Sequence, residues 1–197
     1  MKHVLCFGDS NTWGFIPGTC KRYDEHTRWT GILQNELGAD WRIHENGQNG
    51  RTTVFPEPGK NFMTGLGALP YALDTLRPLD AIIIMLGTND LLCGASPAEA
   101  AERMRIFISD LLVCGLPLLL VAPPLMQSGT WVESDALIRS SGQLAPLYRD
   151  LAALCGVSFC DASVWDIPVV FDGVHFSEQG HRRFAEQLEP VFAQTFL

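Results

Sequence analysis

Two polar stretches of this chain contain the side chains that nucleophilic acyl transfer needs. Ser10 directly follows an apolar run, in the stretch GDSN, and His175 lies in DGVH with Asp172 three residues before it. A serine hydroxyl is a weak nucleophile at neutral pH, so it needs a base, and the pKa of histidine is suitably close to neutral. A carboxylate within reach can fix the histidine tautomer. Ser10, His175 and Asp172 are therefore the candidate nucleophile, base and acid.

Two further stretches offer hydrogen-bond donors. The tetrahedral intermediate of acyl transfer needs donors where its negative charge develops. The backbone N–H groups of Ser10 and Gly50 and the side-chain amide of Asn89 are candidates. Each stretch alone also suits a plain turn or a helix cap. The elements that position them must therefore decide between the two interpretations.

Short apolar runs alternate with helical patterns along the chain. Strands are expected at residues 3–7, 41–45, 79–86, 117–124 and 157–162. Helices are expected at residues 27–38, 69–76, 96–115, 134–156 (with a break near Gly142 or Pro146) and 177–196, and loops at 55–67 and 125–133. This alternation predicts an α/β fold with a five-stranded parallel sheet between two layers of helices.

The candidate residues all fall where such a sheet binds ligands, beyond the carboxyl ends of its strands. Ser10 follows the first expected strand, Gly50 the second and Asn89 the third. Asp172 and His175 lie just before the last helix. The shared position favours one site for acyl transfer over a set of unrelated turns.

Size and composition limit the other possibilities. The 197 residues predict one domain, 1–197, and the net charge of −8 without a basic run argues against nucleic acid as a partner. The longest apolar segment, 115–125, contains three prolines and is far shorter than the about 20 residues of a membrane span. Six cysteines without a CxxC pair predict reduced thiols in a cytoplasmic protein and no metal site.

The four stretches together resemble the SGNH (GDSL-type) hydrolase family. Its marker residues correspond to Ser10 in GDSN, Gly50 in GQNGR, Asn89 in GTND and His175 in DGVH. Asn11 stands where the family name has leucine. The resemblance implies a flavodoxin-like three-layer α/β/α sandwich and a serine esterase without metal or cofactor. It also implies that Ser10, Gly50 and Asn89 form the oxyanion hole.

Several longer stretches, including LCFGDSNTWGF and IIMLGTND, resemble the bacterial arylesterase/acyltransferase branch of that family. This branch implies hydrolysis of short-chain aryl or alkyl esters through an acyl-enzyme, with acyl transfer to alcohols as a further activity. Relatives in the branch are often homo-oligomers, which is the expectation for this chain. A carbohydrate acetylesterase, a thioesterase, a lysophospholipase and a non-catalytic binding module on the same fold remain as alternatives.

Four apolar residues near the candidate site are expected to wall its pocket, although core packing suits them equally: Trp13, Phe171, Val174 and Phe176. Arg51 is expected to anchor its loop to an acidic residue, with binding of a carboxylate substrate as the alternative. The long loop at 54–68 is a candidate lid or interface.

Overall fold

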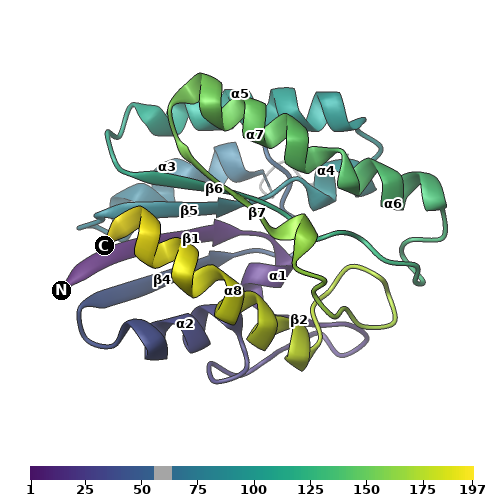
Figure 1. The fold of residues 1–197 in the computed structure, drawn as a ribbon, viewed down its shortest axis with the longest axis horizontal. Helices are drawn as coiled ribbons and strands as arrows, with labels where there is room; N and C mark the ends of the chain where they lie inside the picture. The colour runs from purple at the N-terminus through teal and green to yellow at the C-terminus, as the bar shows by residue number, and fades with distance from the viewer. Residues whose placement is uncertain (56–63) are drawn as a thin grey trace.

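A five-stranded parallel sheet lies between two layers of helices (Figure 1). The computed structural model describes residues 1–55 and 64–197. Most of the expected loop at 54–68, with its predicted role as lid or interface, lies outside the described residues. The architecture confirms the predicted fold class.

All five expected strands form, and their bounds differ from the prediction by a few residues. They are β1 (Lys2–Gly8), β4 (Trp41–Gly47), β5 (Ala81–Met85), β6 (Leu118–Ala122) and β7 (Ser158–Asp161). The long helices are α2 (Trp29–Leu37), α3 (Gly65–Thr75), α5 (Pro97–Leu112), α6 (Asp135–Gly142), α7 (Leu144–Cys155) and α8 (Glu178–Phe196). The short elements are α1 (Ser10–Trp13), α4 (Thr88–Leu92), a 3-10 turn at Ala162–Val164, and a hairpin of β2 (Phe15–Ile16) and β3 (Lys21–Arg22).

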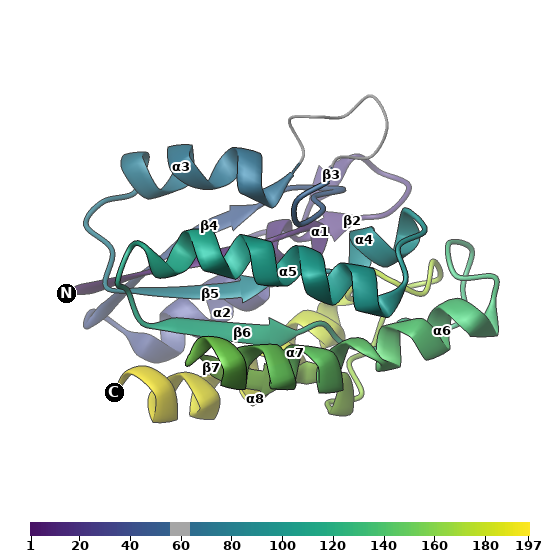
Figure 2. The same cartoon turned by 90° about the horizontal axis from the view of Figure 1, so that it is seen from above.

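The strands run in the order β4-β1-β5-β6-β7. The chain leaves β1 toward β4 on one side and later returns to β5 on the other, so the order reverses between β1 and β5. Such a switch point opens a crevice at the carboxyl ends of the two strands. Figure 2 shows α1 and α4 at that end of the sheet, with both chain termini at the opposite end.

The alternation of side chains along the buried strands builds two separate cores. Leu5 and Phe7 of β1 face a core shared with α3, α5 and α7. Val4 and Cys6 face the other core, which α2 and α8 cover. Both faces of a strand inside a parallel sheet are buried, so its sequence is a continuous apolar run.

Local signals explain where the helices begin and break. Ser96 and Glu99 form a capping box ahead of α5, and the Ser177 side chain caps α8 as expected. The expected helix at 134–156 breaks at Gly142, whereas Pro146 lies in the first turn of α7, where proline is tolerated. The start predicted for α3 was wrong: the Thr64 side chain accepts from the Gly67 N–H, and the helix begins at Gly65.

The β2–β3 hairpin was not predicted from the sequence. It is held over the end of β4 by Glu45, which hydrogen-bonds to Arg22 in the hairpin and, at 3.0 Å, to Arg28. The Arg22 guanidinium also donates to the carbonyl of Trp13. Each strand of this hairpin has two residues, which is too short for a periodic sequence pattern. Its position became visible only in the folded structure, through the ion pair of Arg22 with Glu45.

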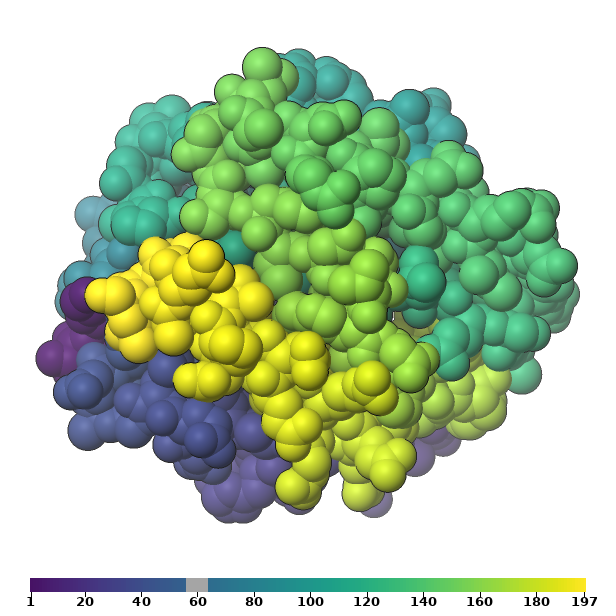
Figure 3. All heavy atoms as spheres, in the orientation of Figure 1, coloured from purple at the N-terminus to yellow at the C-terminus, as the bar shows by residue number. Residues whose placement is uncertain are grey.

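The last helix covers the sheet on the side of α2 (Figure 3, yellow over blue). Its residues Phe184, Leu188 and Phe192 are buried in the second core. Among the described residues, no helix combines the length and apolar character needed to cross a bilayer.

His181 of α8 is a buried histidine whose ring makes few polar contacts. Its Nδ1 lies 3.4 Å from the Trp29 N–H, and its Nε2 has no hydrogen-bond partner among the described residues. Burial lowers the pKa of His181 to about 3, with a smaller contribution from the positive charge of Arg28. The folded protein therefore keeps this ring neutral well below the pKa of an exposed histidine.

This shift predicts a specific loss of stability in acid. Between pH 6.5 and 3 the unfolded chain takes up a proton at residue 181 that the folded chain refuses. The contribution of His181 is therefore complete above pH 6.5 and falls by about 1 kcal/mol for each pH unit below it. His181→Asn keeps an acceptor near Nδ1 but does not titrate. We expect its free energy of unfolding, measured with urea, to fall less between pH 7 and pH 5 than that of the wild type.

His26→Asn, the same substitution at an exposed histidine, is the matched control for the change of residue type. Asp9 acts in the opposite direction, since burial raises the pKa of this carboxyl to about 6 and favours the folded state in acid. The difference between variant and wild type isolates His181. Equal pH dependence in the two proteins would contradict the prediction.

Candidate active site

Ser10 stands at the first position of α1, directly beyond the carboxyl end of β1. The Asp9 side chain caps this short helix by accepting from the Asn11 N–H at 2.9 Å. Gly8 permits the tight exit from the strand, because a Cβ there would lie 2.1 Å from the hydroxyl oxygen of Thr12. The break after the first strand therefore presents a serine at the edge of the sheet, in a fixed backbone conformation.

Ser10, His175 and Asp172 form a continuous chain of hydrogen bonds. His175 Nε2 lies 2.9 Å from Ser10 Oγ, and His175 Nδ1 lies 2.6 Å from Asp172 Oδ2. All three side chains are almost completely buried. The fold thus joins residues 165 positions apart in the geometry of a serine, a base and an orienting acid.

The other carboxylate oxygen of Asp172 is also occupied. Asp172 Oδ1 accepts from the backbone N–H groups of Val174 and His175, at 2.9 and 3.0 Å. Burial alone would raise the pKa of Asp172, but the hydrogen bonds from His175 and from these two N–H groups hold it below its usual value. The acid therefore stays ionised beside the imidazole.

Gly50 lies in the loop that follows β4, and Asn89 lies in α4 just after β5, where it bonds to that loop. Gly50 adopts a left-handed conformation (φ +73°), which favours glycine, and the next residue points its carbonyl at Asn89. Asn89 Nδ2 donates to that Arg51 carbonyl at 3.1 Å. One proton of the amide is thereby fixed, which orients the whole amide group.

Arg51 anchors this loop, but not through an acidic residue as the sequence suggested. Its guanidinium donates to the carbonyls of Gly8 and Asn46 and to the side chain of Gln48, and it stacks 4.1 Å from the ring of Phe7. Buried carbonyl oxygens at a strand end need donors, and the planar guanidinium satisfies several at once. Burial lowers the pKa of Arg51 to about 10.

Asp90 holds the same loop two residues beyond Arg51, at Thr53. Its buried carboxylate accepts from the backbone N–H and the hydroxyl of Thr53, at 3.0 and 2.8 Å, and from Arg103 at 3.2 Å. Sequence reasoning did not single out Asp90, although its place next to Asn89 in GTND was a signal. Together Asp90 and Arg51 determine where Gly50 and Asn89 lie relative to Ser10.

The model of the GDSL-like lipase/acylhydrolase family matches residues 6–183. The chain belongs to this family. It is a carboxylic ester hydrolase, which confirms the class of enzyme that the four stretches predict. The comparison with curated protein sequences gave no match.

Solved structures agree with this esterase over their full length. The aryl esterase of M. smegmatis is 32% identical with a TM-score of 0.93, and each chain is covered completely. A putative arylesterase from Agrobacterium tumefaciens is 35% identical with a TM-score of 0.88, again with both chains covered completely. A carbohydrate acetylesterase from Sinorhizobium meliloti is 34% identical with a TM-score of 0.90 and the same coverage.

Two of the four residues expected to wall the pocket lie in the cores of the esterase. Phe176 is 1% exposed and packs against the rings of His181 and Phe184, and Val174 is buried in the first core. Core packing, the alternative open for both residues, describes their surroundings, and their part in a pocket stays a prediction.

The other two expected wall residues are accessible. Phe171 is 65% exposed, and Trp13 is half-buried beneath the guanidinium of Arg22. Neither ring is a direct neighbour of the imidazole of His175. Their part in a pocket stays a prediction.

Among the described residues, the rings of Phe15 and Trp131 contact the imidazole. The ring centroid of Phe15 lies 4.9 Å from that of His175 at an interplanar angle of 60°, and Trp131 lies at 4.9 Å and 80°. Trp131 is 51% exposed. Sequence reasoning missed both. The signal for Trp131 was available, because its loop follows β6 and so starts from the same edge of the sheet.

The loop that carries Trp131 is fastened to the loop of the triad acid by three backbone hydrogen bonds. The N–H groups of Gln127, Thr130 and Trp131 donate to the carbonyls of Gly173, Phe171 and Asp172 at 2.9, 3.1 and 3.1 Å. The backbone of Trp131 is therefore bonded directly to Asp172, the residue that hydrogen-bonds to His175. This pairing accounts for the exposed tryptophan beside the imidazole.

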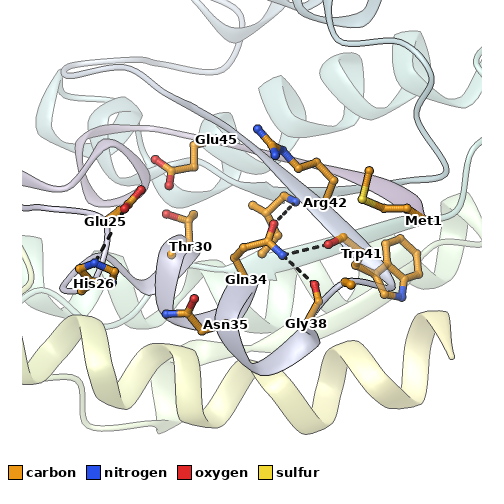
Figure 4. Close-up of a pocket in the computed structure, with 13 residues that line it drawn as sticks. Met1, Glu25, His26, Thr30, Gln34, Asn35, Gly38, Trp41, Arg42 and Glu45 are labelled. Carbon is orange, nitrogen blue, oxygen red and sulfur yellow. Dashed lines mark hydrogen bonds and ion pairs between the residues drawn. The ribbon is translucent and has the colours of Figure 1, made fainter.

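A separate polar pocket of about 570 Å³ lies between α2 and β4 (Figure 4). In it Gln34 donates to the carbonyls of Gly38 and Trp41 and accepts from the Ile43 N–H, so its amide covers the open edge of the sheet. Ser10, Asp172 and His175 are not among the described residues that line this pocket. Among residues 1–55 and 64–197, no three or more His, Cys, Asp or Glu side chains lie together in a way that could hold a metal ion.

Asn89→Ala is expected to lower kcat by about 10²- to 10³-fold, because the missing amide would otherwise stabilise the developing oxyanion. The check is steady-state kinetics with p-nitrophenyl acetate, alongside thermal unfolding to show that the fold persists. Asn35→Ala, at an exposed asparagine of α2, is the matched control and should leave kcat unchanged. Wild-type kinetics in Asn89→Ala would remove this amide from the oxyanion hole.

Proposed function

We propose that the chain hydrolyses short-chain aryl or alkyl carboxylic esters through an acyl-enzyme formed on Ser10. The observation that carries this proposal is the hydrogen-bonded chain from Ser10 Oγ through His175 to Asp172, at 2.9 and 2.6 Å. A serine so connected loses its proton to the imidazole as it attacks.

In the first half-reaction Ser10 Oγ forms a bond to the acyl carbon, and its proton passes to His175 Nε2. The tetrahedral intermediate then breaks the bond to the leaving alcohol, which takes that proton. In the second half-reaction water attacks the acyl carbon and gives a proton to His175 Nε2. That proton returns to Ser10 Oγ as the carboxylic acid leaves.

The negative oxygen of both tetrahedral intermediates is held by Ser10 N–H, Gly50 N–H and the Asn89 amide. Support for this assignment comes from the fixed orientation of Asn89 against Arg51 and from the left-handed turn at Gly50. Donors that are already oriented stabilise developing charge without reorganising during the reaction.

The preference for aryl or alkyl esters rests on the aromatic surfaces at the site. Phe15 and Trp131 contact the imidazole that must protonate the leaving alcohol, so the leaving group lies between them. Apolar surface buried there favours apolar alcohols. The likeness to the aryl esterase of M. smegmatis supports the same class of substrate.

A carbohydrate acetylesterase is the second candidate. Its support is the likeness to the acetylesterase of Sinorhizobium meliloti at 34% identity. The half-exposed ring of Trp131 is also suited to stacking against the apolar face of a sugar. Acetylated sugars and aryl acetates, compared as substrates, separate the two candidates by their kcat/KM.

The test uses p-nitrophenyl acetate and a fluorophosphonate probe with intact-mass detection. The proposal expects release of nitrophenol and one probe adduct per chain, with the adduct lost in Ser10→Ala. Absence of both would favour the non-catalytic binding module. Addition of a primary alcohol tests acyl transfer, since an ester product would form in competition with the acid.

Trp131→Ala is expected to lower kcat/KM for phenyl and naphthyl acetates by about tenfold and for ethyl acetate much less, because an aromatic alcohol loses a large contact surface. Tyr71→Ala, at an exposed aromatic residue of α3, is the matched control. An equal loss for all three esters would show that Trp131 supports His175 and does not contact the alcohol.

A further inference from the structure

Asn11, the residue after the proposed nucleophile, spans the backbone on both sides of His175. Its Nδ2 donates to the carbonyl of Val174 at 3.1 Å, and its Oδ1 accepts from the N–H of Phe176 at 2.9 Å. One side-chain amide thus pairs with the backbone as a neighbouring strand would. The side chain is 6% exposed.

The backbone of Asn11 is itself held in place. Its N–H donates to Asp9 Oδ1 at 2.9 Å, and its carbonyl accepts from the indole Nε1 of the buried Trp29 at 3.1 Å. The side-chain amide of Asn11 therefore extends toward the His175 loop from a backbone that is fixed in place. An amide held at both ends in this way defines a distance between the two loops.

The backbone bonds that His175 makes itself run within its own loop. Its N–H donates to Asp172 and its carbonyl accepts from the Val170 N–H at 2.8 Å. These bonds shape the loop, but they do not relate it to Ser10. The two bonds of Asn11 do relate it, because Asn11 is covalently next to Ser10.

We propose that Asn11 is a positioning residue that sets the distance between Ser10 Oγ and His175 Nε2. This inference rests on the proposed function of Ser10 and His175. Asn11 touches neither reacting atom and acts through the backbone of residues 174–176. Leucine, the residue in the family name, has no polar atom and would leave both backbone groups without this partner.

The test compares Asn11→Leu, Asn11→Asp and Thr12→Val with the wild type. Asn11→Asp keeps an acceptor for the Phe176 N–H but loses the donor to Val174. Thr12→Val is the matched control, because Thr12 is also buried in α1 but its hydroxyl has no hydrogen-bond partner among the described residues. All four proteins are assayed for thermal unfolding, for kcat and KM at several pH values, and for the downfield NMR signal of the His175 Nδ1 proton.

We expect kcat to fall by about 10- to 100-fold in Asn11→Leu, as for a displaced catalytic group, with KM nearly unchanged. We also expect a smaller loss in Asn11→Asp, a shift of the acid limb of the pH–rate profile, and a moved His175 proton signal in both variants. Thr12→Val should match the wild type in each measurement. If Asn11→Leu does not fold, Asn11→Asp carries the same comparison.

The inference is overturned if the Asn11 variants unfold at lower temperature yet keep the kcat, pH profile and His175 signal of the wild type. That result would make Asn11 a purely structural residue. An inactive wild type that forms no Ser10 adduct would instead contradict the proposed function. The NMR signal would still report on positioning in that case, so the two failures are distinguishable.

Discussion

Ser10→Ala is expected to lower kcat for p-nitrophenyl acetate by about 10⁴- to 10⁶-fold while the fold persists. The loss is this large because the residues of a triad act as a unit. Without the nucleophile, the other two contribute almost nothing to the rate. The substitution removes one hydroxyl that bonds only to His175 Nε2 among the described residues. The melting temperature should therefore change by only about a few degrees.

The exposed Ser109 supplies the matched control for Ser10→Ala. Ser109 is exposed on α5 and bonds to the Arg105 carbonyl within its own helix, so Ser109→Ala should keep full activity. Fluorophosphonate labelling should follow the same division, with an adduct in Ser109→Ala and none in Ser10→Ala. Substantial turnover in Ser10→Ala would eliminate the acyl-enzyme mechanism proposed for this chain.

Asp172→Asn is expected to lower kcat by about 10⁴-fold through the wrong histidine tautomer. Two backbone N–H groups, of Val174 and His175, point at Oδ1, so the new amide must keep its oxygen there. Its NH₂ group then faces His175 Nδ1 and donates to it. The imidazole proton moves to Nε2, and that nitrogen can no longer accept the proton of Ser10.

Asp9 is a buried carboxylate next to the nucleophile in the sequence and gives the matched control for Asp172→Asn. Asp9→Asn keeps an oxygen that can accept from the Asn11 N–H, so we expect kcat within about tenfold of the wild type. The measurement is kcat across pH 5 to 9 for both variants. A larger loss in Asp9→Asn than in Asp172→Asn would reverse the assignment of the acid.

Sequence reasoning reached the strands and the longer helices because their signals are local. A buried run such as Ala81–Met85 and a capped segment such as Pro97–Leu112 each carry their pattern within a few residues. The first residue of a helix was predicted wrongly where the sequence carried no clear capping signal, as at Thr64 before α3. The β2–β3 hairpin had no local pattern at all, and ion pairs to Glu45 hold it in place.

By itself the sequence determined that a serine, an amide and an Asp–His pair follow separate strands of a parallel sheet, and hence that they meet at one edge. The tertiary structure alone decided the strand order, the contacts of Phe15 and Trp131 with His175, and the bridge from Asn11. It also placed Val174 and Phe176 in the cores. These outcomes depend on contacts between residues of different elements, up to 163 positions apart for Asn11 and Val174, and neither periodicity nor spacing carries information about such contacts.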